Sequence, residues 1–371
     1  MKIRIERDVL ADAVAWAART LPSRPSLPVL AGVMMTAEGS SVTLSSFDYE
    51  VSARVEIDAV VDEPGTALVS GRLLTDIAKS LPPKPVVIAS EGSRVSITCE
   101  RSSFTLPTLP LEDYPQLPEI PQASGTVDAS LFATAVGQVA IAAGRDDTLP
   151  TLTGIRMEFD GSTITLAATD RYRLAVREFT WKPSSSSLEV AALVPARNLS
   201  ETAKSLAAGE TVSIALGASG ERLIGFEGNS RRTTPRLLDG EFPKYRSLLP
   251  SESSSIADVD TAALIDAVKR VALVAERNTP VRLAFGGGEV SLRAGAGDDA
   301  QAAEALECAI EGDDIEIAFN PGYLLDGLAA CGAQTARFSF TQATRPAVLT
   351  GQGEGAVEEY RYLLMPVRLT G

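Results

Sequence analysis

Apolar side chains recur every three to four residues over 8–20, which predicts an amphipathic helix. Further along, β-branched residues gather over 42–44, 51–57 and 163–167 with glycines between the runs, a pattern typical of strands. A second helix is predicted near 72–81. Helices alternating with runs of strands indicate an α+β class with mostly antiparallel sheets. The apolar face of the first helix consists of Val9, Leu10, Ala13, Val14 and Ala17.

This succession of elements is repeated along the chain. Residues 10–56 align without a gap onto 132–178 at a constant offset of 122, so that Asp48 meets Asp170. A third, fainter copy includes 264–268, which resembles the start of the first copy. A unit of this size is a whole domain rather than a solenoid repeat. We therefore expect three similar domains, each with two helices packed on antiparallel sheets.

Two polar or proline-rich segments separate the copies. Five prolines between Pro107 and Pro121 exclude a helix and favour an extended connector. Serines and a glutamate over 251–255 indicate a second linker. The serine-rich run 183–187 lies inside the second copy, and we interpret it as a surface loop. The predicted domains are 1–122, 123–251 and 252–371.

Composition excludes several classes of protein. The 371 residues include no histidine, which removes Ser-His-Asp catalysis and histidine metal sites. The net charge of −14 repels nucleic acid at long range, unlike a simple charge-driven DNA binder. Three scattered cysteines, no apolar run long enough for a bilayer and no apolar leader at Met1 predict a cytoplasmic protein without membrane contact or disulfides.

Candidate catalytic motifs are weak. The segment 295–300 superficially matches a dinucleotide fingerprint, but the predicted antiparallel surroundings favour a loop. Three acid pairs, at 146–147, 298–299 and 313–314, are candidate ligands for a divalent cation, although adjacent acids in turns are usually solvated. No nucleophile is paired with a base. We expect no enzyme activity, no cofactor and no metal.

Basic residues recur at matched helix positions. Arg72 and Lys79 flank the second helix of the first copy, and Arg197 and Lys204 occupy the equivalent places 125 residues later. One interpretation is a solvated helix surface; the recurrence favours a basic lining in an otherwise acidic protein. Further candidates for this lining are Arg24, Lys269 and Arg270.

The chain ends in an apolar run from Leu363 to Val367. A last core strand is one interpretation. Pro366 cannot donate a hydrogen bond to a neighbouring strand, so pairing should stop there. Apolar residues left over at that point would line a surface groove suited to a short peptide.

Several motifs together resemble one family. They are Thr169-Asp170-x-x-Arg173-Leu174, Asp239-Gly240-x-Phe242-Pro243-x-Tyr245, the terminal Leu363-Leu364-Met365-Pro366-Val367-Arg368-Leu369 and the early Arg24-Pro25-x-Leu27-Pro28. With the threefold repeat they resemble the bacterial DNA sliding clamp, the beta subunit of DNA polymerase III. The resemblance implies a non-catalytic processivity factor, a head-to-tail homodimeric ring of six domains around duplex DNA. It further implies sequence-independent DNA contact in the nucleoid, and an ATP-driven clamp loader.

The resemblance also implies a peptide groove between the second and third domains. There the replicative polymerase and other replication and repair proteins insert a Gln-Leu-x-Leu-Phe-like peptide. The matching groove positions are Leu152, Thr169, Arg171, Leu174, Pro243, Arg246, Leu248, Asn320, Tyr323, Leu363, Leu364, Met365, Pro366, Val367 and Arg368. The dimer contact would place Phe104 and Leu106 of one chain against Leu273 and Val274 of the other.

Position 171 departs from the family pattern. The family commonly has a small residue after Thr-Asp, where this chain has Arg171 followed by Tyr172. A long cation at the groove wall should narrow or charge it, so we hypothesise a preference for a carboxylate near the peptide's anchor.

Simple geometry agrees with a dimeric ring. A domain of this size is about 35 Å across, so three touching spheres leave a hole of about 5 Å and six leave about 35 Å. Duplex DNA is roughly 20 Å across, so two chains suffice where one does not. Two rival hypotheses remain open: a metal-dependent enzyme acting on nucleotides or sugars, and a ring or scaffold that never meets DNA.

Overall fold

The computed structural model describes residues 1–119, 121–217, 222–250, 252–275, 279–295, 300–357 and 359–368. The chain divides into two compact units: Met1–Ser130 with Glu201–Leu237, and Leu131–Ser200 with Leu238–Gly371. Both units combine α-helices with sheets whose paired strands are antiparallel in the described residues. The expected α+β class with repeated helix pairs on antiparallel sheets is therefore confirmed.

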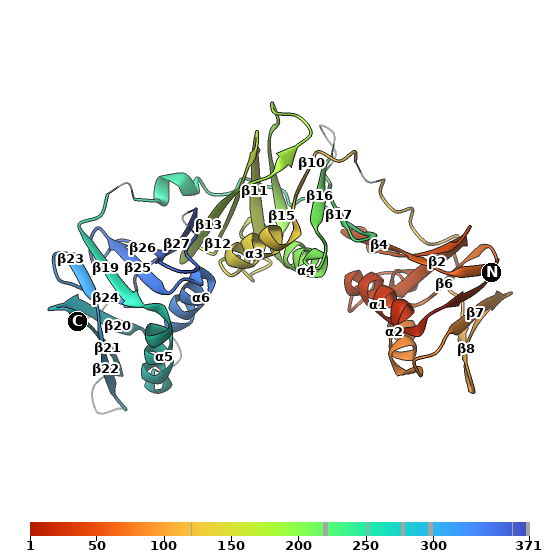
Figure 1. Cartoon of the computed structure of the whole chain (residues 1–371), viewed down its shortest axis with the longest axis horizontal. Helices are drawn as coiled ribbons and strands as arrows, with labels where there is room; N and C mark the ends of the chain where they lie inside the picture. Colours follow the sequence, from red (N-terminus) through yellow and green to blue (C-terminus); the bar gives the residue numbers. More distant parts are fainter. Residues whose placement is uncertain are drawn as a thin grey trace. The chain divides into compact units, whose positions relative to one another are not determined.

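The first unit contains two sheets. In one the strand order is β5-β1-β7-β8-β9, and in the other β10-β16-β17-β18-β4-β3-β2-β6 are neighbours. Figure 1 shows its helices α1 and α2 side by side. Helix α1 packs on β3 and β4, and α2 packs on β2 and β6. The elements are β1 Lys2–Ile5, α1 Arg7–Ala17, β2 Gly32–Glu38, β3 Ser41–Phe47, β4 Val51–Asp58, β5 Val60–Glu63, β6 Gly65–Ser70, α2 Gly71–Ser80, β7 Val86–Glu91, β8 Arg94–Cys99, β9 Ser102–Pro107, β10 Gly125–Asp128, β16 Thr211–Leu216, β17 Ile224–Gly228 and β18 Arg231–Pro235.

The residues that the helical period assigns to one face of each helix form much of the core of this unit. Helix α1 buries Leu10, Val14 and Trp16 against side chains from both sheets. Val9, expected on the apolar face, is instead 43% exposed. It precedes Leu10, and successive residues are about 100° apart around a helix, so Val9 lies at the flank of the buried stripe. Helix α2 buries Leu74, Ile77 and Ala78 and leaves its basic residues in solvent.

The second unit also has two sheets. Their strand orders are β15-β11-β12-β13-β27-β26-β25-β19-β23 and β22-β21-β20-β24. Helices α5 and α6 pack on each other in this unit (Figure 1). The elements are β11 Gly154–Asp160, β12 Thr163–Thr169, β13 Arg173–Thr180, β15 Glu189–Pro195, β19 Ser255–Asp260, α5 Thr261–Val271, β20 Val281–Gly286, β21 Glu289–Ala294, β22 Ala302–Glu307, β23 Ala309–Gly312, β24 Ile315–Phe319, α6 Pro321–Cys331, β25 Thr335–Phe340, β26 Ala347–Gln352 and β27 Tyr360–Leu364. Three further elements are α3 Ala129–Ala140, β14 Lys182–Pro183 and α4 Ala196–Leu206.

The sequence repeat is reproduced element by element. Strands β2, β3 and β4 begin and end 122 positions before β11, β12 and β13. The turn after β3 and the turn after β12 also match: Tyr49 has a φ of +75° and Arg171, at the same offset, has +80°. In both turns an aspartate, Asp48 or Asp170, precedes the residue with positive φ. Its side chain accepts hydrogen bonds from the N–H groups two and three residues further along the chain. Similar sequences therefore form the same local structure in both copies.

The predicted connectors are largely confirmed. Residues 108–119 form no helix or strand. Of the loop expected over 183–187, serines 184–187 lie exposed in a loop, whereas Pro183 belongs to β14. The second linker is shorter than expected, because Ser255 is the buried first residue of β19. Its side chain donates to the carbonyl of Asp313. Ser251 lies outside the described residues.

Several expectations about chemistry concern places that the structure describes only in part. Asp298, Asp299 and most of the 295–300 motif lie outside the described residues. Within the described ones, no group of three or more metal-ligating side chains gathers. Cys99, Cys308 and Cys331 are all buried free thiols, as the absence of a disulfide framework predicted. No described helix is long and apolar enough to cross a membrane.

Candidate functional site

The terminal strand lies beside the Thr169-Asp170 motif. Strand β27 pairs with β13, so that Leu363 lies opposite Leu174 and Leu364 opposite Arg173. The strand ends at Leu364, before Pro366, as predicted. The chain then continues along the second unit: the N–H of Met365 donates to the carbonyl of Tyr172 at 2.9 Å. The tail of the third copy is thereby fixed against a turn of the second.

Hydrogen bonds within the motif define that turn. Thr169 Oγ1 donates to the carbonyl of Arg173 at 2.7 Å and accepts the N–H of Arg171 at 3.2 Å. Asp170 Oδ1 accepts the N–H groups of Tyr172 and Arg173 at 3.0 and 3.1 Å. The positive φ of Arg171 explains why a small residue suits this position, because glycine adopts such a φ without steric cost.

A largely apolar cavity of about 410 Å³, here called the anchor pocket, opens beside this turn. Seven of the predicted groove residues line it, namely Thr169, Arg171, Leu174, Pro243, Leu248, Leu363 and Met365. Sequence reasoning missed the other lining residues, which are Arg173, Ser247, Thr344, Arg345 and Pro346. Arg173 was within the quoted motif, whereas the 344–346 loop carried no signal of its own.

A second cavity of about 600 Å³, the side pocket, shares Arg171 and Arg173 with the first. The predicted residues Leu152, Asn320 and Tyr323 line it together with three aspartates and with Arg145, Arg171 and Arg173. Asn320 also caps helix α6, because its side chain accepts the N–H groups of Gly322 and Tyr323. The acidic lining residues are Asp146, Asp170 and Asp326.

Arg173 connects the two cavities. Its guanidinium is buried, donates to Asp170 at 2.9 Å and Asp326 at 2.6 Å, and lies 4.3 Å above the centre of the Tyr323 ring. Burial alone lowers the pKa of an arginine, but the hydrogen bonds to Asp326 and Asp170 outweigh it and raise the pKa of Arg173. The charge is therefore permanent, and it holds strand β13 against helix α6.

Arg246 lies next to the anchor pocket but does not line it. It donates to Glu158 at 2.5 Å, and Tyr245 donates to the same carboxylate oxygen at 2.9 Å. Arg156 binds the other oxygen at 2.6 Å. Burial raises the pKa of Glu158, but the hydrogen bonds from Arg156, Arg246 and Tyr245 lower it on balance. This cluster fixes the 245–248 segment, whose Ser247 and Leu248 face the pocket.

Four of the predicted tail residues line neither cavity: Leu364, Pro366, Val367 and Arg368. Leu364 is only 1% exposed. Successive strand residues point to opposite faces, so Leu364 faces the interior while Leu363 faces the pocket. The alternation explains why Leu364 lines neither cavity, whereas Pro366, Val367 and Arg368 lie beyond the end of the strand.

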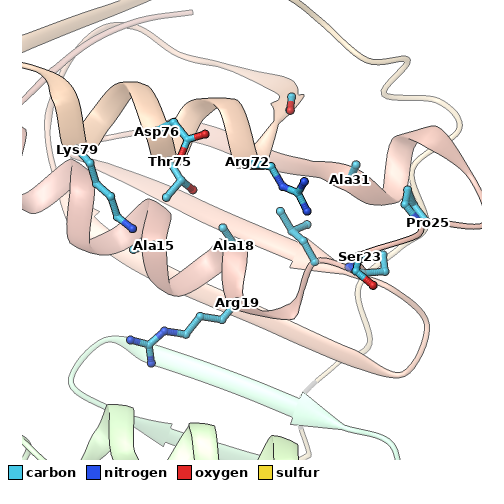
Figure 2. A pocket seen from close by; sticks show the side chains of 13 residues that line it. Ala15, Ala18, Arg19, Ser23, Pro25, Ala31, Arg72, Thr75, Asp76 and Lys79 are labelled. Carbon is cyan, nitrogen blue, oxygen red and sulfur yellow. The ribbon is translucent and has the colours of Figure 1, made fainter.

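The basic residues of the first unit surround a third cavity, of about 590 Å³. Figure 2 shows Arg72 and Lys79 extending from α2 towards α1, with Arg19 at the other side. Arg19, which was not predicted as part of the basic lining, donates to Ser205. Arg24 is exposed in the adjoining loop, between the lining residues Ser23 and Pro25.

The remaining basic candidates differ in their surroundings. Arg197 and Lys204 are exposed and lie seven residues apart on α4, the spacing of the pair on α2. Lys269 on α5 lies 3.9 Å from Asp266. Arg270 donates to Glu304 at 3.0 Å through Nε, which neutralises much of its charge. The predicted lining is therefore weakest in the third copy.

The predicted dimer residues lie near sheet edges of their respective units. Phe104 is 37% exposed on β9, an edge strand, whereas Leu106 is buried. In the second unit, Leu273 is 84% exposed and Val274 is half-buried. Both follow α5, which packs on the edge strand β22. Leu273 is the most exposed large apolar side chain among the described residues.

Comparison with known proteins matches this architecture along the whole chain. Family models of the DNA polymerase III beta subunit match as the N-terminal domain at 1–118, the central domain at 126–244 and the C-terminal domain at 246–368. The Beta sliding clamp of Streptomyces coelicolor is 59% identical, with 100% of both chains covered.

Solved structures are similar over the same length. The DNA polymerase sliding clamp of Bacillus subtilis has a TM-score of 0.93 at 26% identity, covering 100% of this chain and 99% of the other. The Pseudomonas aeruginosa sliding clamp bound to griselimycin has a TM-score of 0.92 at 29% identity, covering 100% of both. The repeated domains, the terminal strand and these end-to-end matches show that the chain belongs to the DNA polymerase III beta subunit family, the bacterial sliding clamps.

Proposed function

We propose that two copies of this sliding clamp close head to tail into a ring of six domains that encircles duplex DNA. The ring tethers the replicative polymerase, the clamp loader and other replication and repair proteins through a peptide bound in the anchor pocket and side pocket. It performs no chemistry itself and works at the nucleoid. The proposed domains are 1–122, 123–251 and 252–371.

Two features of the separate units support the dimer. Strand β9 is the open edge of a five-stranded sheet, and β22 is the open edge of a four-stranded one. Open edges present unpaired backbone groups that a second strand can bind. Arg101 beside β9 is exposed, and β22 ends at the exposed Glu307. Opposite charges and opposite edges favour a head-to-tail contact, which closes into a ring without forming filaments.

The buried position of Leu106 narrows this proposal. The side chain is 1% exposed within its own unit, so it does not reach a second chain. The apolar part of the contact then consists of Phe104 on one side and Leu273 with Val274 on the other.

A ring explains how an acidic protein holds DNA. A closed ring cannot leave the DNA that it encircles. The protein therefore needs only weak, sequence-independent phosphate contacts. The exposed cations on α2 and α4 provide them at matched positions. A net charge of −14 keeps the ring from adhering to DNA and allows it to slide.

The anchor pocket carries the tethering function. Leu174, Leu248 and Leu363 supply apolar walls beside the polar turn that starts at Thr169. A volume of about 410 Å³ is within the usual size of small ligand sites and suits one or two apolar side chains of a peptide. The larger side pocket then accommodates the polar end of the same peptide.

Molecular mass in solution tests the ring. Sedimentation at micromolar concentration should give twice 39.0 kDa. A stable monomer would contradict the dimeric ring and would favour the scaffold hypothesis.

A further inference from the structure

We propose that Trp16 and Arg231 form a clasp that controls how readily the joint between β4 and β18 opens, where the first copy of the repeat meets the second. The corresponding joint between the second and third copies, at β13 and β27, is closed by neutral, buried side chains. The chain therefore has one adjustable joint and one fixed joint. In the proposed ring the first joint would yield when DNA is admitted, but the inference concerns the single chain and stands without the ring.

The backbone of the two joints is the same. Five residue pairs join β4 to β18, and five join β13 to β27. Just beyond the strands, the N–H of Arg236 donates to the carbonyl of Glu50 at 2.7 Å. In the same way, the N–H of Met365 donates to the carbonyl of Tyr172 at 2.9 Å. A difference in how readily the joints open must therefore come from their side chains.

Charged and aromatic side chains close the first joint. Trp16 of α1 is 5% exposed, and its indole N–H donates to the carbonyl of Arg54 on β4 at 3.4 Å. The guanidinium of Arg231, on β18, lies 5.5 Å from the centre of the Trp16 ring. It also donates to Asp12 of α1 and, at 3.2 Å, to the carbonyl of Ser205 on α4. One side chain of the second copy thereby connects α1 of the first copy with α4 of its own.

Arg19 completes this arrangement from the first copy. Its guanidinium lies 5.9 Å from the centre of the Trp16 ring, and it donates to Ser205. The Ser205 hydroxyl in turn donates to the carbonyl of Glu201 at 2.8 Å. The ring quadrupole of an indole attracts guanidinium groups. Two arginines, one from each copy, are therefore held at the same aromatic ring.

Neutral, buried side chains close the second joint. Gln138 lies 122 positions after Trp16, and Tyr360 occupies the place of Arg231 in the strand pairing. Tyr360 is 1% exposed, and its hydroxyl donates to the carbonyl of Gln138 at 3.2 Å. The Gln138 amide donates to the carbonyl of Ala330 at 3.0 Å. Both hydrogen bonds join the second copy to the third, so opening this joint would break two bonds between buried groups.

The charged joint separates more easily than the neutral one. Trp16 belongs to the hydrophobic core of the first copy and stays there when the joint opens. The groups that part are Arg231 and Asp12, whose side chains are 17% and 71% exposed. Because water solvates both after separation, their ion pair adds little resistance. In addition, Arg54 lies directly opposite Arg232 in the pairing, where like charges are destabilising.

Hydrogen exchange of the full chain, measured by mass spectrometry, tests the clasp. After correction for intrinsic rates, the amide protons of β4 and β18 should be less protected than those of β13 and β27. Arg231→Gln should make exchange in β4 and β18 about threefold faster, the size expected for one cation–π contact, and leave β13 and β27 unchanged. The matched control is Arg232→Gln, which removes the same charge from the neighbouring residue of β18 and should not speed exchange.

Two further measurements assign the effect to the Trp16 ring. In Trp16→Leu, adding Arg231→Gln should have little further effect, because both changes remove the same contact. The chain has two tryptophans, so Trp181→Phe leaves Trp16 as the only one. In that background, Arg231→Gln should increase the quenching of Trp16 fluorescence by acrylamide, whereas Arg232→Gln should not.

The contradicting results differ for each statement. Unchanged exchange and unchanged quenching in Arg231→Gln would refute the clasp. An equal increase in Arg232→Gln would also overturn it, since any lost charge on β18 would then suffice. Faster exchange in β1 and β7 as well would mean that the whole unit is less stable and that no joint opens selectively. Finally, β13 and β27 no better protected than β4 and β18 in the unmodified chain would contradict the fixed joint.

Discussion

Arg173 Nη1 donates to Asp326 Oδ2 at 2.6 Å, joining a strand of the second repeat to a helix of the third. The Arg173 side chain is 7% exposed, and its partners Asp170 and Asp326 are 14% and 50% exposed, so the pair with Asp170 is the buried one. Removing one member of a buried ion pair leaves an uncompensated charge. The groove therefore depends on an interaction between residues that lie 153 positions apart.

We predict that Arg173→Ala lowers the free energy of unfolding of the second unit by about 3 kcal/mol. Urea denaturation, followed by the fluorescence of Trp181, measures the loss. Arg282→Ala is the control, since exposed residues without such partners change stability by about 0.5 kcal/mol or less. Equal stability of the two variants would show that the Arg173 ion pairs do not hold the unit together.

Position 171 offers a separate test of backbone strain. Arg171→Gly should raise the free energy of unfolding by up to about 1 kcal/mol, because it removes an unfavourable positive φ. Arg171→Gln should give no such gain, since it keeps a Cβ. Urea midpoints of the two variants measure the difference. A glycine variant no more stable than the glutamine variant would mean that the turn stores no strain.

The environment of Glu158 predicts that the stability of the fold depends on pH. Burial raises its pKa, but its hydrogen bonds from Arg156, Arg246 and Tyr245 lower it below 4.5. A carboxylate with a depressed pKa stabilises the fold above its unfolded pKa, and the contribution is lost as pH falls through the folded pKa. Melting temperatures of the unmodified chain and Glu158→Gln should therefore differ at pH 7 and converge below pH 4.5.

The control for that comparison is Glu241→Gln, at an exposed acid without an ion pair among the described residues. It should track the unmodified chain at every pH. A constant gap between Glu158→Gln and the unmodified chain from pH 7 to pH 3 would contradict the assigned role of the carboxylate.

The exposed Leu273 predicts a variant that prevents dimer formation. A charge at a buried interface is costly to desolvate, so Leu273→Asp should reduce the mass in solution to 39.0 kDa. Val190→Asp controls for a charge at another exposed apolar side chain, which is 41% exposed in the same unit, and should leave the dimer intact. Light scattering distinguishes them, and a dimeric Leu273→Asp would place the interface elsewhere.

The cations of α2 predict how the affinity for duplex DNA depends on salt concentration. Each phosphate contact contributes a slope of about −0.9 to log K against log salt. Replacing Arg72 and Lys79 by glutamine should make the slope shallower by about one to two for duplex DNA. Replacing Lys182 and Arg282, two exposed cations outside the proposed lining, makes the same change in net charge. Equal slopes for both double variants would argue against specific contact by α2.

Local patterns predicted much of this fold, and distant contacts explain where they failed. The offset of 122 predicted matching strands. The structure adds a matching positive φ at Tyr49 and Arg171, because a turn depends on its own few residues. Pro366 correctly predicted the end of the last strand. The pairing of β27 with β13 was not predicted, since the two strands are far apart in sequence. The family resemblance implied only that residues of both strands share a groove.

The sequence likewise predicted some residues of the candidate groove and missed others. Residues within a motif, such as Thr169 and Leu174, do line the anchor pocket. Arg345 was missed, because a loop residue becomes a lining residue only when its sheet is assembled. Leu106 and Leu364 were placed at functional surfaces although both are buried. The sequence shows that a residue is apolar, but only the register of its strand shows which side it faces.

Retention on circular DNA tests encirclement most directly. Dissociated chains are allowed to reassemble in the presence of a nicked circular duplex, and gel filtration separates bound from free protein. The account predicts that the dimer elutes with the circle and is lost once one cut makes the same DNA linear. Retention that is unaffected by linearisation would show that affinity, and not a closed ring, holds the protein on DNA.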